Sequence, residues 1–343
     1  MKNRYIIPVF IPHYGCTHQC IFCNQQYITG KKTFVNEHDV EKIIEEHLSR
    51  ITKPRFVEVA FYGGSFTALS FDIQDSLLAP TRKALREGRI QSIRISTRPD
   101  VVSAETANFL MKNSVSTIEL GIQSLDDSVL NAANRGHSVK DAENAAEILR
   151  NYNFSWGIQL MPGLPEEDWS SLLLSGNRAV RLKPHFARIY PVIVIKHTPL
   201  ECQFKAKLYT PLSLEEAVRK SAFLKVLFFR NNIPVIRTGL QATEELDNGD
   251  VVVAGPYHPA FGELVEGYIF YNILLHALEE IPYYRDVDIV CYFRDESKIR
   301  GCCNTYLLRL ADRTGRKIKL IPKGIQQGEI SIIQQGCTYV VSC

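Results

Sequence analysis

Residues 5–23, YIIPVFIPHYGCTHQCIFC, join an apolar, strand-like run to a short loop that carries three cysteines. Cys16, Cys20 and Cys23 have the spacing C-x3-C-x2-C. Three thiolates on one compact loop can hold three irons of a 4Fe–4S cube, and the fourth iron is then open to a small molecule. A structural zinc ion is the competing interpretation, with His13 or His18 as a further ligand. The loop therefore predicts a metal centre directly after the first strand.

Short β-rich runs alternate with amphipathic helices after this loop. We expect strands at 57–62, 92–97, 117–122, 155–161 and 186–195, and helices at 40–51, 71–87, 103–112, 138–150 and 168–181. This alternation predicts a parallel sheet with helical crossovers, either as a barrel or as an open doubly wound sheet. In both folds the functional groups lie at the carboxyl ends of the strands. The cysteine loop, Gly63-Gly64-Ser65 and Gln123-Ser124 all occupy such positions.

The composition is that of a folded protein with nearly balanced charge. The chain has 343 residues, of which 45% are apolar, and 40 basic residues stand against 37 acidic ones. This balance excludes a histone-like polycation. No run approaches the roughly 18–20 apolar residues that a membrane helix needs, and we see no secretory signal at the N-terminus. We therefore expect a cytoplasmic protein with no membrane segment.

The sequence around the cysteines resembles the signature of the radical S-adenosylmethionine (SAM) superfamily, which has an aromatic residue where Phe22 stands, before the third cysteine. The resemblance implies that SAM binds the open iron and that the reduced cluster cleaves it to a 5′-deoxyadenosyl radical, which abstracts hydrogen. It also implies a reductant such as flavodoxin or ferredoxin. The cofactors implied are a 4Fe–4S cluster and SAM.

Further positions are similar to those of coproporphyrinogen dehydrogenase-like members of this superfamily. By this resemblance the Gly63-Gly64 backbone meets the methionine amino group of SAM, although many relatives carry an acidic residue in place of Ser65. Arg135 would meet the methionine carboxylate, because a guanidinium offers paired donors. The ribose and adenine region would be met by the remaining candidates, Ser96, Arg98, Gln123 and Gln159.

Longer segments resemble the Elongator catalytic-subunit branch of the superfamily. They are Ser96-Thr97-Arg98-Pro99-Asp100, residues 119–124, residues 194–196, residues 237–241 and residues 255–265. In that branch the radical domain acts on a wobble uridine of transfer RNA, and an acetyltransferase domain follows. Only 73 residues follow Phe270 here, and they show no glycine-rich pyrophosphate loop. We therefore expect the radical core of this branch without its acetyltransferase domain.

The expected fold is α/β, a partial (β/α)6 radical-SAM-type barrel with a small C-terminal α/β appendage. We expect the core at 1–200, a branch-specific extension at 201–285 and the appendage at 286–343, with a strand, a helix and two further strands. Substrate-side candidates, taken from strand ends and from the branch-like segments, are Tyr190, Lys196, His197, Arg237, Gln241 and His258.

The appendage has two further features of interest. Residues 298–323 contain eight basic side chains and one acid, which could bind the phosphates of transfer RNA or a small anionic metabolite. The later cysteines Cys302, Cys303, Cys337 and Cys343 include no C-x2-C pair. We therefore expect buried structural thiols there rather than a second metal centre.

Three functions follow from these observations. The leading one is a radical SAM enzyme that modifies a nucleoside of transfer RNA. A radical SAM enzyme acting on a small anionic metabolite is the second. A zinc-containing RNA-binding module, from a different class of protein, is the third.

Overall fold

A computed structural model describes residues 4–13, 15–16, 18–24, 35–53, 55–241, 244–247, 249, 251–324 and 326–342. The chain divides into two compact units. Met1–Ala217 and Leu227–Pro259 form the first, which we call the barrel unit, and Val218–Val226 and Ala260–Cys343 form the second, the small unit. The three-part division expected from the sequence stays a prediction.

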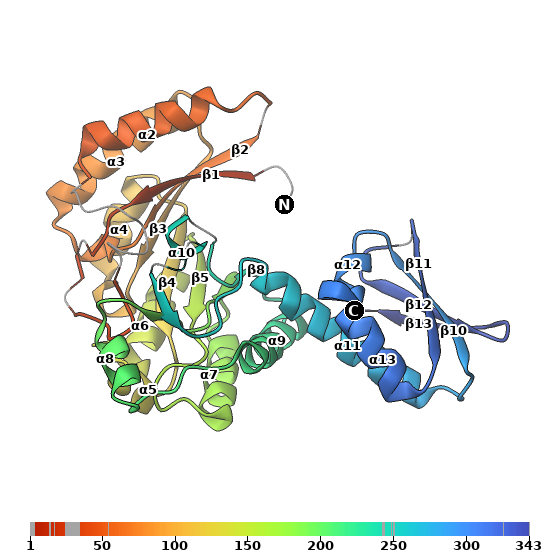
Figure 1. The fold of residues 1–343 in the computed structure, drawn as a ribbon. Helices are drawn as coiled ribbons and strands as arrows, with labels where there is room; N and C mark the ends of the chain where they lie inside the picture. Colours follow the sequence, from red (N-terminus) through yellow and green to blue (C-terminus); the bar gives the residue numbers. More distant parts are fainter. Residues whose placement is uncertain are drawn as a thin grey trace. The chain divides into compact units, whose positions relative to one another are not determined.

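The barrel unit is built on a seven-stranded parallel sheet that curls into a half-barrel (Figure 1). The strand order is β1-β2-β3-β4-β5-β6-β8, so neighbours in the sequence are mostly neighbours in the sheet. This confirms the predicted barrel fold. The strands are β1 (Arg4–Phe10), β2 (Phe56–Tyr62), β3 (Ser92–Thr97), β4 (Thr117–Gln123), β5 (Ser155–Leu160), β6 (Phe186–Ile189) and β8 (Val235–Thr238).

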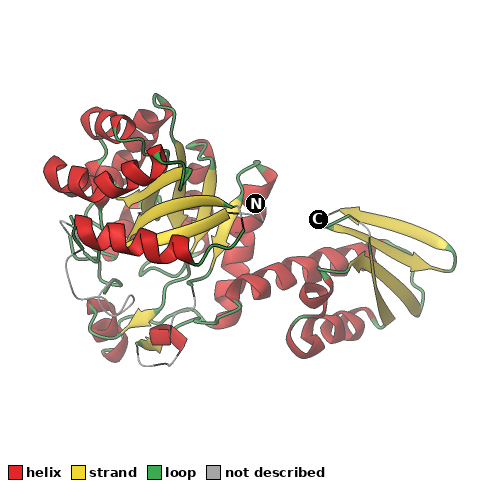
Figure 2. Cartoon of the chain, turned by 90° about the horizontal axis from the view of Figure 1, so that it is seen from above, coloured by secondary structure: helices red, strands yellow, loops and turns green. Residues whose placement is uncertain are grey.

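Helices separate the strands and surround the outside of the curved sheet (Figure 2). Reciprocal capping hydrogen bonds begin five of the described helices, at Asn36, Ser103, Ser138, Asp168 and Ser213. Each such pair of hydrogen bonds satisfies backbone N–H groups that would otherwise lack partners, and so fixes where the helix begins. The main helices are α2 (Glu37–Ser49), α3 (Phe71–Arg86), α4 (Ala104–Lys112), α6 (Val139–Arg150) and α7 (Trp169–Arg181). Shorter segments are η1 (Phe66–Ala68), η2 (Pro99–Val101), α5 (Asp127–Ala132), α8 (Pro199–Lys205) and α10 (Glu244–Asp247).

The two faces of the sheet differ in chemistry. Ile93 and Ile95 on β3 are fully buried apolar side chains, whereas Arg94 and Ser96 alternate with them. Successive residues of a strand point to opposite faces, so this alternation gives one apolar face and one polar face. The strands of this parallel sheet therefore carry polar groups into the half-barrel.

The expected strand at 186–195 is wrong in its second half. β6 ends at Ile189, and Val194–Ile195 form a separate short strand, β7, which pairs antiparallel with β9 (Val252–Ala254). Pro191 explains the break, because proline has no N–H to donate to a ladder. β8 pairs with β6 and joins the sheet as a seventh strand. It lies within residues 201–285, which we expected to form an extension outside the barrel.

The small unit is a four-stranded sheet with helices. The strand order is β11-β10-β12-β13, with β10 and β11 parallel and the other pairs antiparallel. A core centred on Leu274, Ile289 and Ile332 joins α11 to the sheet. The expected strand, helix and two strands are present, and β13 is an additional strand. The elements are α11 (Phe261–Glu280), β10 (Asp286–Tyr292), α12 (Glu296–Arg300), η3 (Cys302–Asn304), α13 (Thr305–Thr314), β11 (Lys317–Lys323), β12 (Glu329–Gln334) and β13 (Cys337–Ser342).

One long helix, α9 (Leu214–Arg230), contributes residues to both units. None of the helices in the described residues combines the length and apolar character that crossing a bilayer requires.

Candidate active site

The cysteine loop begins where β1 ends and lies against the turn that follows β2. The Ile11 N–H donates to the Tyr62 carbonyl at 2.8 Å, and the His13 N–H donates to the Gly63 carbonyl at 3.0 Å. Cys16 is exposed, and its Sγ lies 3.7 Å from Ser65 Oγ. The structure thus brings the first cysteine next to the predicted Gly63-Gly64-Ser65 turn.

Gly15 makes this close approach possible. Its φ of +70° lies in the left-handed region, and a Cβ there would stand 2.4 Å from the Ser65 carbonyl oxygen. Any side chain would therefore push the cysteine loop away from the turn after β2.

The second half of the loop is anchored in an apolar cluster. Cys20, Ile21 and Phe22 are buried, and the half-buried Cys23 packs against the same cluster. The Ile21 N–H donates to the Ala133 carbonyl at 3.2 Å, and the Ile21 carbonyl accepts from the Leu200 N–H at 2.9 Å. Phe22 is thus part of this anchor. The other members of the cluster are Val129, Ala133, Leu164, Val192, Val194, Leu200 and Tyr209.

Arg135 connects the cysteine loop to the end of β4. Its Nη1 donates to Cys20 Sγ at 3.0 Å, and its Nη2 donates to the Gly121 carbonyl. Its Nε is buried and has no hydrogen-bond partner among the described residues. A Cβ on Gly121 would lie 3.0 Å from Arg135 Nη2, so glycine leaves room for the guanidinium.

Arg98 contributes a second guanidinium with an unpaired N–H. Its Nε and Nη2 donate to the two carboxylate oxygens of Asp100 at 2.9 and 3.0 Å, while Nη1 is buried without a partner in the part of the chain that the structure describes. Nη2 also lies 3.5 Å from His18 Nδ1 on the cysteine loop. Burial, followed by the positive charge of Arg135, lowers the pKa of His137 to about 3, so this histidine is neutral at pH 7. Two buried guanidiniums with free N–H groups favour a bound anion such as a carboxylate.

The two predicted glutamines lie side by side at the end of the sheet. The Gln159 amide donates from Nε2 to Gln123 Oε1 at 2.9 Å. Gln123 has a φ of +72°, which a residue with a Cβ rarely adopts, and it sits at an irregularity in the pairing of β4 with β5. Such strain at the end of a strand is common where a side chain must face a ligand. Ser96 is half-buried on β3 and stands in register with Glu119 on β4.

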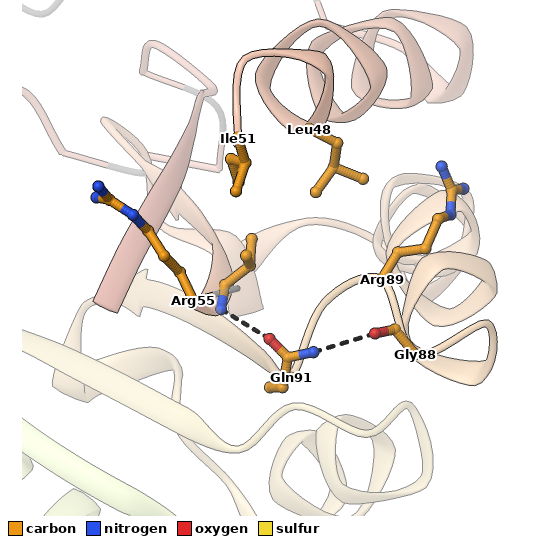
Figure 3. Close-up of a pocket in the computed structure, with 7 residues that line it drawn as sticks. Leu48, Ile51, Arg55, Gly88, Arg89 and Gln91 are labelled. Carbon is orange, nitrogen blue, oxygen red and sulfur yellow. Dashed lines mark hydrogen bonds between the residues drawn. The ribbon is translucent and has the colours of Figure 1, made fainter. Parts of the chain in front are cut away.

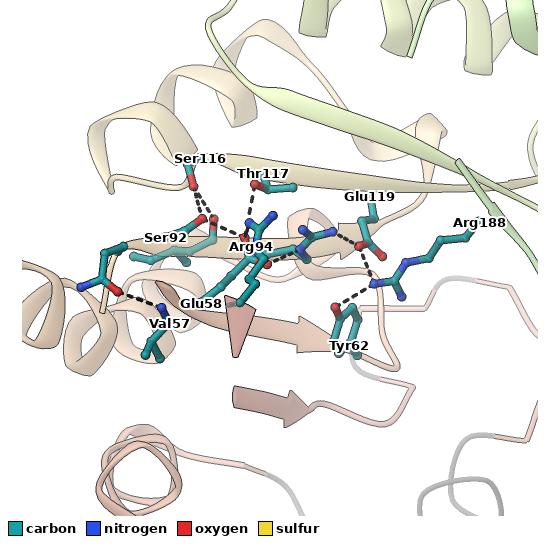
Figure 4. Close-up of polar contacts among 12 residues, drawn as sticks. Val57, Glu58, Tyr62, Ser92, Arg94, Ser116, Thr117, Glu119 and Arg188 are labelled. Carbon is teal, nitrogen blue, oxygen red and sulfur yellow. Dashed lines mark hydrogen bonds and ion pairs between the residues drawn. The ribbon is translucent and has the colours of Figure 1, made fainter. Parts of the chain in front are cut away.

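A buried network of charged side chains lies deeper in the half-barrel, and the sequence reasoning missed it (Figure 4). Arg94 Nε donates to Glu58 at 2.8 Å and its Nη1 to Glu119, which also pairs with Arg188 at 2.9 Å. Each of β2, β3, β4 and β6 thus contains one charged residue in an otherwise uncharged strand. A lone charge inside a buried strand was the signal that could have revealed the network.

Two tyrosines complete this network. Arg188 donates from Nη2 to the Tyr62 hydroxyl and from Nη1 to the Tyr190 hydroxyl, both at 3.1 Å. Burial, followed by the nearby Glu119 carboxylate, raises the pKa of Tyr62 to about 12. Burial also raises the pKa of Tyr190. Both phenols therefore keep their protons. Tyr190 is a predicted substrate-side residue, and Tyr62, Glu119 and Arg188 are new candidates beside it.

A pocket of about 360 Å³ lies elsewhere on the barrel unit (Figure 3). Val57 and Gln91, which line it, stand at the amino ends of β2 and β3, and the Val57 N–H donates to Gln91 Oε1 at 2.8 Å. The cysteine loop follows the carboxyl end of β1, at the opposite end of the parallel strands. This pocket is therefore not part of the candidate site. The other lining residues are Leu48, Ile51, Arg55, Gly88 and Arg89.

The thiols of the loop and the guanidiniums beside them suit an iron–sulfur cluster with an anionic ligand. A zinc ion needs its ligands about 2.0–2.3 Å from one centre, whereas each thiolate of a 4Fe–4S cube binds a different iron. The three cysteines form no disulfide, and unpaired guanidinium N–H groups stand beside them for an anionic ligand.

Three of the eight basic side chains in segment 298–323 are paired with acidic residues or buried in the structure. Lys298 pairs with Glu266 at 2.6 Å, and Arg300 pairs with Glu296 at 2.9 Å. Arg316 is buried and donates to the Leu278 carbonyl at 2.8 Å. The five exposed members are Arg309, Arg313, Lys317, Lys319 and Lys323.

The expectation of buried thiols at Cys302, Cys303, Cys337 and Cys343 is wrong for three of these four cysteines. Cys302, Cys303 and Cys337 are exposed, because they lie in the turn before α13 and at the start of the edge strand β13. Cys343 lies outside the described residues.

Comparison with known proteins identifies the family of this chain. Residues 10–174 match the radical SAM superfamily, and residues 184–270 match the radical SAM C-terminal domain. The tRNA uridine(34) acetyltransferase of Methanocaldococcus jannaschii is 26% identical over 65% of this chain and 44% of its own length. The heme chaperone HemW of Bacillus subtilis is 26% identical over 63% of this chain and 57% of its own length. This chain therefore spans about half the length of these relatives.

A solved structure shows the same fold. The archaeal Elp3 of Methanocaldococcus infernus, with an N-terminal deletion, superposes with a TM-score of 0.61 at 24% identity, over 78% of this chain and 62% of that one. The two family matches together span most of residues 10–270, which include the cysteine loop and nearly all of the barrel sheet. The chain thus belongs to the radical SAM superfamily.

Proposed function

We propose that this protein is a radical SAM enzyme that cleaves SAM reductively and uses the resulting radical to modify a nucleoside of transfer RNA. The observation that carries the first part is the placement of three cysteines on a loop fixed against Gly63, Ser65 and Arg135. Members of the superfamily use a 4Fe–4S cluster and SAM.

The residues of this chain fit those two groups. Cys16, Cys20 and Cys23 would hold the cluster as thiolates. When bound, the cluster supplies the electron that breaks the C–S bond of SAM and releases a 5′-deoxyadenosyl radical. Arg135, already fixed to Cys20, would direct its unpaired Nε toward the methionine carboxylate, and the Gly63-Gly64 backbone would receive the amino group. The ribose and adenine would lie against Ser96, Arg98, Gln123 and Gln159.

The buried network of charged side chains that includes Glu119 and Arg188 would face the substrate. It lies inside the half-barrel, and its two phenols end at the carboxyl side of β2 and β6. Protonated phenols there could donate hydrogen bonds to a substrate while the interior excludes water.

Transfer RNA is the substrate class that the relatives favour, since the archaeal relative is named for an activity on tRNA uridine. The exposed residues of segment 298–323 would bind phosphates. An external reductant such as flavodoxin or ferredoxin would supply electrons. A transfer RNA substrate and such a reductant both fit a cytoplasmic protein. A small anionic metabolite remains the alternative substrate, because the same basic side chains would attract it.

The cleavage activity can be tested directly. Protein purified without oxygen and reconstituted with iron and sulfide is incubated with SAM and dithionite, and 5′-deoxyadenosine is measured. We expect product from the natural protein and from Cys202→Ala, which changes an exposed cysteine outside the loop, and none from Cys16→Ala. A colourless protein that holds one zinc per chain and forms no 5′-deoxyadenosine would support the zinc-containing RNA-binding module instead.

A separate experiment tests the substrate. Nucleosides from the transfer RNA of cells with and without the gene are compared by mass spectrometry. We expect the loss of one modified nucleoside. Unchanged nucleosides together with an altered small anionic metabolite would assign the second substrate class.

A further inference from the structure

Two adjacent cysteines of the small unit are not among the residues of the candidate active site. Cys302 and Cys303 follow α12 and precede α13, both are exposed, and their Sγ atoms lie 3.8 Å apart. This distance is unusual for neighbours in a chain, because adjacent side chains do not face each other on a helix and point to opposite faces of a strand.

The backbone of this turn holds the two thiols on the same side. Cys303 has φ 51° and ψ 35°, and Asn304 has a φ of 60°. Both are left-handed conformations, which residues with a Cβ rarely adopt, asparagine more often than cysteine. Gly301 also has a positive φ, of 67°. Strained positions of this kind persist where the surrounding structure enforces them, and they cluster at functional sites.

The neighbours of the turn provide that enforcement. The Thr305 hydroxyl donates to the Cys302 carbonyl, and Arg300 Nη1 donates to Asn304 Oδ1 at 3.3 Å. A hydrogen bond with Cys303 raises the pKa of the Cys302 thiol, as expected for two thiols close enough to share a proton.

We propose that Cys302 and Cys303 form a reversible redox site that closes to a disulfide between adjacent residues. A low-molecular-weight disulfide such as oxidised glutathione is the oxidant. One thiolate attacks it and releases one glutathione thiol, and the neighbouring thiolate then displaces the second. The protein loses two electrons and two protons, and the oxidant gains them as two thiols.

Reversibility follows from the covalent geometry. Adjacent Cα atoms are about 3.8 Å apart across a trans peptide, which is shorter than the roughly 4.4–6.8 Å that disulfides prefer. The closed ring is therefore strained, and strained, exposed disulfides are the readily reduced ones. This site would respond to the thiol–disulfide balance instead of locking the fold.

Trypsin isolates the pair for an experiment. Cleavage after Arg300 and Arg309 releases residues 301–309, GCCNTYLLR, which contain no other cysteine. Cleavage after Lys196 and Lys205 releases residues 197–205, HTPLECQFK, whose lone exposed Cys202 is a matched control. The cysteines of the cluster loop fall on a different peptide.

The reconstituted full-length protein is treated with oxidised glutathione, blocked with N-ethylmaleimide, digested and analysed by mass spectrometry. We expect peptide 301–309 to be lighter by two hydrogen atoms and to carry neither reagent, whereas peptide 197–205 carries one of them. Dithiothreitol before blocking should restore two maleimide additions to peptide 301–309.

Single-serine variants supply the second measurement. In Cys302→Ser or Cys303→Ser the remaining thiol should retain glutathione, because no neighbour can displace it. The proposal is overturned if the natural pair carries maleimide or glutathione on each cysteine, as Cys202 does. This outcome is independent of SAM cleavage.

Discussion

Arg135 is the side chain on which the proposed SAM site most depends. It bridges Cys20 and the Gly121 carbonyl, and its Nε remains available. Arg135→Lys keeps the positive charge but loses the paired donors. A hydrogen bond to a charged group contributes about 1.5–3 kcal/mol, so the Kd for SAM should rise about tenfold to a hundredfold.

Binding of SAM to the reconstituted variant, measured by calorimetry at matched iron content, checks this prediction. Arg86→Lys, an exposed substitution on α3, is the control and should bind as the natural protein does. Equal affinities of the two variants for SAM would show that Arg135 does not contribute to SAM binding.

Glu119 holds two buried guanidiniums, those of Arg94 and Arg188. Glu119→Gln removes the negative charge and leaves both arginines buried without it. Breaking a buried pair in this way costs about 3–5 kcal/mol, so the free energy of unfolding should fall by that order. Glu45→Gln breaks an exposed pair with Arg89 and should cost less than about 1 kcal/mol. Urea unfolding of both variants measures the difference, and similar losses would show that the network adds little.

His137 predicts how stability depends on pH. Its pKa is about 3 in the folded protein, mainly because of burial, and about 6.5 when unfolded. Between these two pH values the unfolded chain binds more protons at His137 than the folded protein does. The contribution of this group to the free energy of unfolding is therefore complete above pH 6.5 and is lost as the pH falls toward 3. The loss approaches roughly 1.4 kcal/mol per pH unit for this group.

Unfolding by urea at pH 7 and at pH 5 measures this effect. His137→Gln should lose less stability between the two pH values than the natural protein does. His38→Gln, at an exposed position on α2, should behave as the natural protein. An unchanged pH dependence in His137→Gln would mean that the histidine is hydrated in solution.

Among the elements, the contact between the cysteine loop and the turn after β2 decides whether the site can assemble. Gly15→Ala places a Cβ 2.4 Å from the Ser65 carbonyl oxygen at a φ of +70°. Gly88→Ala is matched, with a φ of +71° and no atom within 4 Å of its Cβ. Gly88→Ala should therefore lower the free energy of unfolding only by the cost of holding alanine in the left-handed conformation, about 1–2 kcal/mol. Gly15→Ala should in addition lower the iron bound per chain after reconstitution, and equal iron contents would contradict the role of this contact.

The order of elements in the barrel was predictable because buried parallel strands and amphipathic helices differ in periodicity. The end of β6 was not predicted, because the apolar run continues through Val192 and Ile193 beyond Pro191. The position of the cysteines beside Gly63 was predictable, since both follow neighbouring strands. The Arg94 and Glu119 network was not, because single charges inside strands reveal their partners only when the register is known.

For the whole molecule, the charge available to RNA is smaller than the sequence suggests. Lys317 and Lys319 stand in register with Asp286 and Asp288 on β10, and Arg316 is buried. Arg309→Gln with Arg313→Gln and Lys323→Gln should weaken transfer RNA binding and make it less dependent on salt. The slope of log affinity against log salt should fall by about one for each phosphate that the variant no longer neutralises. Filter binding at several salt concentrations measures this slope.

Arg316→Gln is the control for that experiment. It removes a charge that bonds to the Leu278 carbonyl, so it should destabilise the small unit without changing the salt slope. An unchanged slope in the triple variant would place any RNA-binding surface elsewhere on the chain.

Helix α9 constrains how this protein can be divided. Its middle, Val218–Val226, belongs to the small unit, where Lys225 pairs with Glu266 at 2.7 Å, whereas Leu214–Ala217 and Leu227–Arg230 belong to the barrel unit. The polypeptide therefore enters the small unit, leaves it and returns. A protein shortened at Pro259 would lack Glu266, the ion-pair partner of Lys225 on this helix. A fragment that begins at Ala260 would lack Val218–Val226, so recombinant dissection must keep this helix together with the small unit.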